Sequence, residues 1–278
     1  MSIISQSFIN HMITTYVKSV IELLSTKHGF NKDEAYLAYI GNVKSTASAS
    51  ATEKLNTEDT GKQFEMAICL AFGITYNGTY KYGMEIPEKL KPRLTQLIDQ
   101  NLFPMCKHTA SKGARYDFTS SDDDSKHLSA KTTKKGGGKV APQVIGQPSP
   151  QKFCDIVGLP FTTIENLKTD IQTKITTILP FLVDYTFDCS TLFYNKKKDT
   201  IRFIKMISPI VWDNHIFTWT CHANVWNNTS TLKIKNGDNY ISLVEFQFHE
   251  KERTNMAIRW CYENVLTIFK DNFNITNL

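Results

Sequence analysis

The segment 115–131 constrains the fold of this chain more than any other. It holds two runs typical of strands, separated by the polar sequence Ser-Ser-Asp-Asp-Asp-Ser. Such runs on either side of turn-forming residues predict a β-hairpin. Asp117 lies between two aromatic residues in the first run, while Ser129 and Lys131 lie two positions apart in the second. Because side chains alternate along a strand, Ser129 and Lys131 share a face. The hairpin is therefore expected to bring Asp117 close to Lys131.

This pair of side chains has the chemistry needed to hydrolyse a phosphodiester. A carboxylate such as Asp117 can hold a divalent metal, and an amine such as Lys131 can position or deprotonate a water. The spacing alone is weakly specific, since Asp, Ser and Lys are common in this chain. A surface hairpin with an acidic turn is therefore the alternative interpretation.

A helix is predicted over residues 59–72, where Phe64, Ile68 and Phe72 recur at helical spacing. Glu65 lies beside this apolar stripe. Burying a carboxylate there is unfavourable unless it has a partner, and a metal ion is one such partner. The alternative is an ordinary boundary glutamate that is exposed or paired with a nearby lysine.

Two further segments carry basic and amide side chains suited to nucleic acid. Three glycines among the lysines of 134–139 let the backbone approach a polyanion while ammonium groups neutralise phosphates. A strand is predicted over 240–249 and a helix over 254–269, and their Arg, Gln and Asn side chains can contact bases or phosphates. A solvated loop and surface salt bridges are the alternatives. The candidate DNA-binding residues are Lys134, Lys135, Lys139, Gln143, Gln147, Gln247, His249, Arg253, Asn255 and Arg259.

These motifs, in this order, resemble the type II restriction endonucleases of the PD-(D/E)xK superfamily. In that pattern an Asp is followed at variable distance by Glu/Asp-x-Lys, so Asp117 matches the first acid and Lys131 matches the lysine. Ser129 stands where the second acid usually stands, which is a departure from the pattern. The helix around Glu65 is similar to the one that precedes the hairpin in many restriction enzymes. Glu65 is therefore expected to supply the missing carboxylate.

The resemblance implies Mg²⁺-dependent hydrolysis of double-stranded DNA at a short specific sequence. The implied catalytic residues are Asp117, Ser129, Lys131 and Glu65, with Mg²⁺ held by Asp117, Glu65 and the backbone carbonyl of Ala130. A companion DNA methyltransferase acting on the same site is also implied, and both a monomer and a homodimer stay open. The resemblance also implies a GC-centred site, Pu-G-C-Py.

Two other functions stay open at this point. One is a structure-specific repair or recombination nuclease that uses the same hairpin on a damaged or branched substrate. The other is a non-catalytic DNA-binding protein, in which Ser129 marks a dead active site.

The composition limits the classes of protein to which this chain could belong. The 278 residues, of which 41% are hydrophobic, are typical of a globular protein with one large domain or two. The net charge of +5 permits contact with a polyanion without requiring it. The six cysteines include no C-x-x-C pair, which argues against a zinc finger. The N-terminus lacks the features of a signal peptide and no apolar run approaches a membrane span, so we expect an intracellular protein without membrane contacts.

The predicted fold class is α+β, with an α/β-type nuclease core in a helix-rich N-terminal half and a strand-rich C-terminal half. We expect an N-terminal helical region and linker at 1–57, a nuclease core at 58–160 and a helix plus strand-rich DNA-recognition region at 161–278. Further helices are predicted at 87–100, 151–157 and 164–179, with Pro180 ending the last of them. Further strands are predicted at 191–194, 200–207, 216–221 and 231–234.

Overall fold

The computed structural model describes residues 57–111, 114–221, 226–249 and 255–278. The helices and strands reported below belong to one compact unit, Leu55–Tyr80 with Glu85–Leu278, and the segment Lys81–Met84 falls outside it. The predicted N-terminal helical region and linker lie outside the described residues. None of the helices in the described ranges has the length and apolar character that a membrane span requires.

The strands of the described residues form two sheets, and the first has six strands and contains the predicted hairpin. The hairpin is confirmed, because β2 pairs antiparallel with β3 through Phe118↔Leu128 and Thr119↔His127. β5 lies parallel to β3, whereas the other neighbouring pairs are antiparallel. The ranges 58–160 and 161–278 therefore contribute strands to one sheet. Its order is β1 (Cys106–His108), β2 (Phe118–Ser120), β3 (His127–Thr133), β5 (Ser190–Asn195), β6 (Thr200–Met206) and β11 (Phe273–Asn277).

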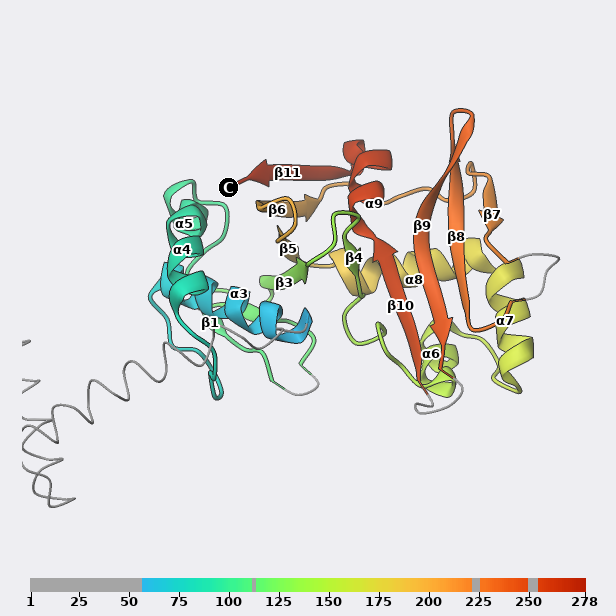
Figure 1. Ribbon diagram of the computed structural model, residues 1–278, viewed down its shortest axis with the longest axis horizontal. Helices are drawn as coiled ribbons and strands as arrows, with labels where there is room; N and C mark the ends of the chain where they lie inside the picture. The colour runs from blue at the N-terminus through green and yellow to red at the C-terminus, as the bar shows by residue number, and fades with distance from the viewer. Residues whose placement is uncertain (1–56, 112–113, 222–225, 250–254) are drawn as a thin grey trace, which may run out of the picture. The chain divides into compact units, whose positions relative to one another are not determined.

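The second sheet has five strands, all paired antiparallel. Its order is β4 (Lys139–Val140), β10 (Met256–Cys261), β9 (Asn239–Phe248), β8 (Thr229–Asn236) and β7 (Phe217–Trp219). Helices α6 (Pro150–Val157), α7 (Ile164–Thr173) and α8 (Ile175–Phe187) lie behind this sheet in Figure 1. Leu179, Phe246 and Trp260 are fully buried in the core between these layers.

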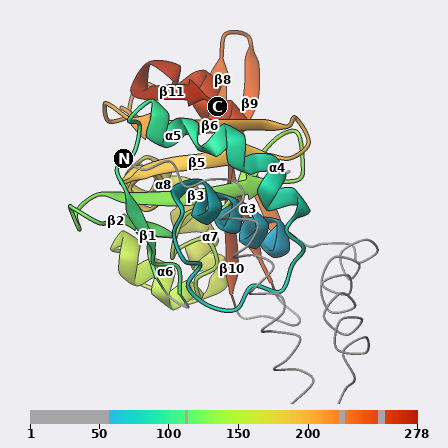
Figure 2. The ribbon, with the colours of Figure 1, turned by 90° about the vertical axis from the view of Figure 1, so that its left-hand side faces the viewer.

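A second core forms where helices α3 (Thr57–Phe72), α4 (Glu85–Leu94) and α5 (Gln96–Asp99) pack against the first sheet (Figure 2). The predicted amphipathic helix is thus confirmed as α3. Its side chains Phe64 and Ile68 are fully buried in a cluster with Leu128 of β3 and Leu192 of β5. Burying each such side chain contributes about 1.5–3 kcal/mol. This packing fixes α3 against the strand that carries Lys131.

The helix predicted at 151–157 is confirmed as α6, but two other helices differ from their predictions. The helix predicted at 164–179 is two helices, α7 and α8, which meet at Lys174. Pro180 lies inside α8 and does not end a helix. Proline removes one backbone hydrogen bond there, and the burial of its neighbours Leu179 and Leu182 offsets that loss. The helix predicted at 87–100 is likewise divided into α4 and α5.

The helix predicted over 254–269 is wrong in its first half. Residues Met256–Cys261 form strand β10, and only Tyr262–Ile268 form a helix, α9. In β10 the side chains of Met256, Ile258 and Trp260 alternate into the core, so tertiary burial selected the strand. The strands predicted after residue 190 are confirmed as β5 to β9. Strands β1, β4 and β11 and the short 3₁₀ helix Lys270–Asn272 were not predicted. The fold is mixed α+β, as expected.

Candidate active site

The two strands of the hairpin separate at Asp117, the residue just before β2. Continuing the strand register by one position would place Asp117 opposite Ser129. Instead, the Asp117 carboxylate oxygen Oδ2 accepts hydrogen bonds from the backbone N–H of Ala130 at 2.7 Å and from Ser129 Oγ at 3.1 Å. The Asp117 carboxylate thus accepts the hydrogen bond from Ala130 N–H that a backbone carbonyl would accept in a continuous strand pair. The hairpin therefore fixes Asp117 against the Ser129-Ala130-Lys131 motif, as the sequence predicted.

Asp117 lies within electrostatic reach of both Glu65 and Lys131. Burial raises the pKa of Asp117, and the negative charge of Glu65 raises it further. The positive charge of Lys131 and the hydrogen bonds from Ala130 and Ser129 oppose this rise without cancelling it. The structure therefore brings together two carboxylates and one ammonium group, all three named as candidates from the sequence.

Glu65 extends from α3 and is only 8% exposed. Its Oε2 atom lies 3.1 Å from Lys62 Nζ, 3.3 Å from His108 Nε2 and 3.5 Å from the Tyr76 hydroxyl. Burial alone would raise the pKa of Glu65, but the hydrogen bond with His108 and the charge of Lys62 outweigh it, so the pKa is lowered. Glu65 is thus an ionised carboxylate that is already paired with a nearby lysine.

Ser129, at the position of the absent second acid, is fully buried and donates its hydroxyl hydrogen to Asp117. It supports the first carboxylate rather than supplying another. Lys131, two residues further along β3, is half-buried and pairs in register with Phe193 of β5. The motif thus contains one hydrogen-bond donor that orients Asp117 and one cation beside it.

The donor set around Asp117 suits a hard divalent cation. Carboxylate and carbonyl oxygens are the ligands that Mg²⁺ prefers, and Mg²⁺ usually keeps several waters while one or two carboxylates hold it. Asp117 and Glu65 provide two carboxylates here, and the carbonyl of Ala130 belongs to the residue whose N–H binds Asp117. Within the described ranges, no cluster of three or more His, Cys, Asp or Glu side chains is placed to bind a metal. The residues therefore fit a Mg²⁺ site with water ligands better than a site enclosed by protein.

The loop that carries Asp117 is anchored by Asp188, at the end of α8. The Tyr116 hydroxyl donates to Asp188 Oδ2, and an Arg115 guanidinium nitrogen lies 2.9 Å from the same oxygen. The Tyr116 ring also stacks on His127 of β3, with ring centroids 3.8 Å apart. These contacts hold the residue before Asp117 on both sides. Sequence reasoning missed Asp188, because no local pattern links it to the hairpin.

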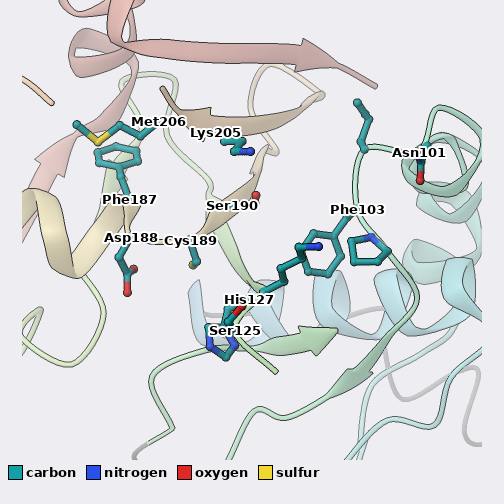
Figure 3. Close-up of a pocket in the computed structure, with 13 residues that line it drawn as sticks. Asn101, Phe103, Ser125, His127, Phe187, Asp188, Cys189, Ser190, Lys205 and Met206 are labelled. Atoms are coloured by element: carbon teal, nitrogen blue, oxygen red, sulfur yellow. The ribbon is translucent and has the colours of Figure 1, made fainter. Parts of the chain in front are cut away.

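Beside this anchor lies a cavity of about 450 Å³, lined by Asp188, Cys189, His127 and Phe103 among others. Figure 3 shows Asp188 and Cys189 on one side of it and His127 with Phe103 on another. Burial and the charge of Asp188 raise the pKa of the Cys189 thiol to about 12, with smaller effects from Lys131 and Asp117. The cavity thus adjoins the candidate site, and its thiol stays protonated at neutral pH.

Three predicted DNA-binding residues meet on the second sheet around a carboxylate that sequence reasoning missed. Glu245 of β9 is 8% exposed, and its carboxylate binds Lys139 of β4 and, at 3.1 Å, Arg259 of β10. Arg259 also donates a hydrogen bond to the Gln247 side chain. These side chains share one face of the sheet, because Arg259 lies opposite Glu245 and Ala257 lies opposite Gln247. Some of the hydrogen-bonding groups of Lys139, Gln247 and Arg259 are therefore already bound within the protein.

The remaining candidates are dispersed. Gln143 is only 5% exposed and its amide approaches Cys189 Sγ at 3.7 Å, whereas Gln147 is exposed. His249 and Asn255 line a mainly apolar cavity of about 480 Å³ together with Phe161 and Phe248. Lys134 and Lys135 lie between β3 and β4, and Arg253 lies outside the described residues. The roles of all these residues in DNA binding stay predictions.

One glycine of the basic loop, Gly138, is required by the fold. Gly138 has a φ of +60°, and a Cβ atom there would lie 3.0 Å from Glu263 Cγ and 3.3 Å from the Phe193 ring. Its carbonyl accepts a hydrogen bond from the backbone N–H of Tyr262 at 2.7 Å. A larger side chain at 138 would therefore strain both the backbone and this contact. At Gly137, by contrast, a Cβ atom would meet nothing within 4 Å.

The sequence of this chain is similar to that of a known enzyme. No family model matches the chain, and no solved structure matches it. The chain is 41% identical over 227 residues to the type II restriction enzyme CviAII of Paramecium bursaria Chlorella virus 1. The aligned region covers 81% of this chain, and the chain spans 64% of that relative's length. The narrower expectation that the chain is the chlorella-virus enzyme CviJI is not confirmed. The chain is a relative of a type II restriction enzyme.

Proposed function

We propose that the protein is a type II restriction endonuclease that hydrolyses phosphodiester bonds in double-stranded DNA, with Mg²⁺ as its cofactor. The observation that carries the proposal is the seating of the Asp117 carboxylate on Ser129 and Ala130, with Lys131 and Glu65 in electrostatic reach. This arrangement supports a PD-(D/E)xK-type site in which Glu65 replaces the second acid. The 41% identity to CviAII supports the same class of activity.

Each residue has a role that follows from its position. Asp117 and Glu65 would hold the metal with their carboxylates, together with the Ala130 carbonyl. A bound Mg²⁺ supplies Lewis acidity at the phosphate and lowers the pKa of a water. Lys131 orients the attacking water through Nζ or donates a hydrogen bond to the charge that develops on the phosphate oxygens. Ser129 keeps Asp117 in place through its hydroxyl.

The proposal extends to the recognition sequence, the companion enzyme and the oligomeric form. The recognition sequence is short and, from the resemblance, GC-centred with the form Pu-G-C-Py. A methyltransferase that modifies the same sequence is the expected companion, and both a monomer and a homodimer stay open as the active form.

The test is incubation of purified protein with supercoiled plasmid, in Mg²⁺ and in EDTA. We expect the wild type to give discrete fragments in Mg²⁺ and none in EDTA, and sequencing of the fragment ends gives the site. Lys131→Ala should lower the cleavage rate by at least about a hundredfold, the size of a lost electrostatic contact to a transition state. Lys126→Ala, in the exposed turn of the same hairpin, is the matched control and should cleave normally.

Three results would contradict the proposal. Normal cleavage by Lys131→Ala would show that Lys131 has no role in catalysis. Cleavage of branched DNA but not of intact duplex would favour a structure-specific nuclease. Metal-independent DNA binding without any cleavage would favour a binding protein in which Ser129 replaces a lost catalytic acid.

A further inference from the structure

His108 lies buried next to Glu65 and contacts partners through both of its ring nitrogens. Its side chain is only 1% exposed, on strand β1. The backbone N–H of Asn77 lies 2.8 Å from Nδ1, and Glu65 Oε2 lies 3.3 Å from Nε2. The imidazole therefore bridges the chain that follows α3 and a carboxylate of the candidate active site.

These two contacts determine which nitrogen carries the hydrogen. A backbone N–H only donates, so Nδ1 must accept from Asn77 with its lone pair. A neutral imidazole then carries its hydrogen on Nε2, which donates to Glu65. His108 is thus a donor aimed at Glu65 in one tautomer.

Packing fixes the ring in this position. Its centroid lies 4.5 Å from that of Tyr76 and 4.9 Å from that of Phe118, the residue after Asp117. His108 therefore binds one carboxylate of the candidate site and packs against the residue beside the other. Lys62 also contacts Glu65, but its side chain is 37% exposed and lies on the same helix, so it provides a looser support.

We infer that His108 is a positioning residue that holds the Glu65 carboxylate in the orientation needed to share a divalent cation with Asp117. The inference rests on the proposed function, because it takes Glu65 and Asp117 as metal ligands. Hydrogen-bond partners of metal ligands typically change metal affinity by about 10- to 100-fold when they are removed. His108 is expected to have an effect of this size without contacting the metal or the DNA.

A pair of matched substitutions tests the donor separately from the ring. His108→Gln and His108→Asn both remove the aromatic contacts with Tyr76 and Phe118. The longer Gln side chain carries its amide nitrogen about as far as Nε2, so it can still donate to Glu65. The shorter Asn side chain reaches only the position of Nδ1, where its oxygen can accept from Asn77 but Glu65 loses its donor.

Calorimetric titration of the full chain with Mn²⁺ or Ca²⁺, without DNA, provides a readout other than cleavage. We expect His108→Asn to weaken cation binding by about 10- to 100-fold, while His108→Gln stays within about threefold of the wild type. In cleavage assays His108→Asn should need more Mg²⁺ for its half-maximal rate and should approach the wild-type rate at saturating Mg²⁺. Equal losses in both variants, or no loss in either, would show that His108 only fills space.

A measurement on the wild type keeps the inference testable if the variants do not fold. Long-range ¹H–¹⁵N spectra of the histidines should show His108 with its hydrogen on Nε2, and Ca²⁺ should shift this resonance while leaving that of His215 unchanged. The Nδ1–H tautomer, or no response to Ca²⁺, would overturn the inference. A wild type that cleaves DNA but fails this test refutes the role of His108 alone. A wild type that neither binds the cation nor cleaves DNA refutes the proposed function as well.

Discussion

The ionised form of Asp117 lowers the free energy of unfolding of the protein. Its pKa is raised above the ordinary value of 3.8, first by burial and then by the charge of Glu65. A carboxyl group with a raised pKa binds a proton more readily in the folded protein than in the unfolded chain. The free energy of unfolding therefore falls as the pH rises from the unfolded-state pKa through the folded-state pKa, and it stays lower at neutral pH. Asp117 thus lowers stability at the pH where a metal would use its charge.

We expect Asp117→Asn to abolish cleavage and to raise the midpoint of thermal unfolding at pH 7 in EDTA. The Asn oxygen still accepts from Ala130 and Ser129, so the local structure is kept. The gain should shrink as the pH falls through the folded-state pKa, because Asp117 is then protonated as well. Asp123→Asn is the matched control in the same hairpin, where hydrogen bonds from Ser125 lower the pKa and no gain is expected. An unchanged or lower midpoint for Asp117→Asn at pH 7 would contradict the burial argument.

The residues of the candidate site differ in how far the sequence could predict them. Asp117 and Lys131 are separated by one short turn, so strand alternation and turn composition were enough to pair them. Glu65 was found because a carboxylate beside an apolar helical stripe is unusual. His108 was missed, since its bond to Glu65 joins residues 43 positions apart and its short strand has no distinctive pattern.

The elements of the second sheet show why local pattern fails near the C-terminus. The residues of β10 suit a helix and a strand about equally, and their pairing with β9 decided the outcome. That pairing turned Arg259 toward Glu245, which lies 14 positions earlier in the chain and 3.1 Å away. Arg259 and Lys139 were predicted as DNA contacts from their charge alone, and the carboxylate that binds both could be seen only after the strands were paired.

Glu245 is expected to hold β4, β9 and β10 together, because its carboxylate joins cations from two neighbouring strands. Glu245→Gln should lower the free energy of unfolding by about 1.5–3 kcal/mol, the contribution of hydrogen bonds to a charged group. It should also strengthen non-specific DNA binding at low salt if Lys139 and Arg259 face the duplex. Urea denaturation and a salt-dependent binding assay measure these effects. Asp238→Asn, in the exposed turn between β8 and β9, removes the same charge and should change stability by less than about 0.5 kcal/mol.

At the scale of the whole molecule, strand β5 joins the two hydrophobic cores. Its side chains alternate, so Leu192 and Tyr194 pack in the core with α3, whereas Phe193 packs in the core with α8 and the second sheet. Leu192 and Phe193 are both fully buried. Because one strand supplies both cores, loss of either core removes the support of the other. The described compact unit is therefore expected to unfold in a single cooperative transition.

Leu192→Ala tests this coupling, because the residue packs in one core while the tryptophans report on the other. Trp212, Trp226 and Trp260 are buried in the core with the second sheet, and Trp219 packs against it. We expect Leu192→Ala to cost about 2–5 kcal/mol and to lower the unfolding midpoint equally by tryptophan fluorescence and by far-ultraviolet circular dichroism. Ile207→Ala, at a side chain 61% exposed, is the control and should leave both midpoints nearly unchanged. A tryptophan transition that stays in place while circular dichroism reveals a second, earlier transition would mean that the cores unfold independently. In that case β5 would be a boundary between two folding units, and the core beside α3, which contains the candidate active site, would be the less stable of them.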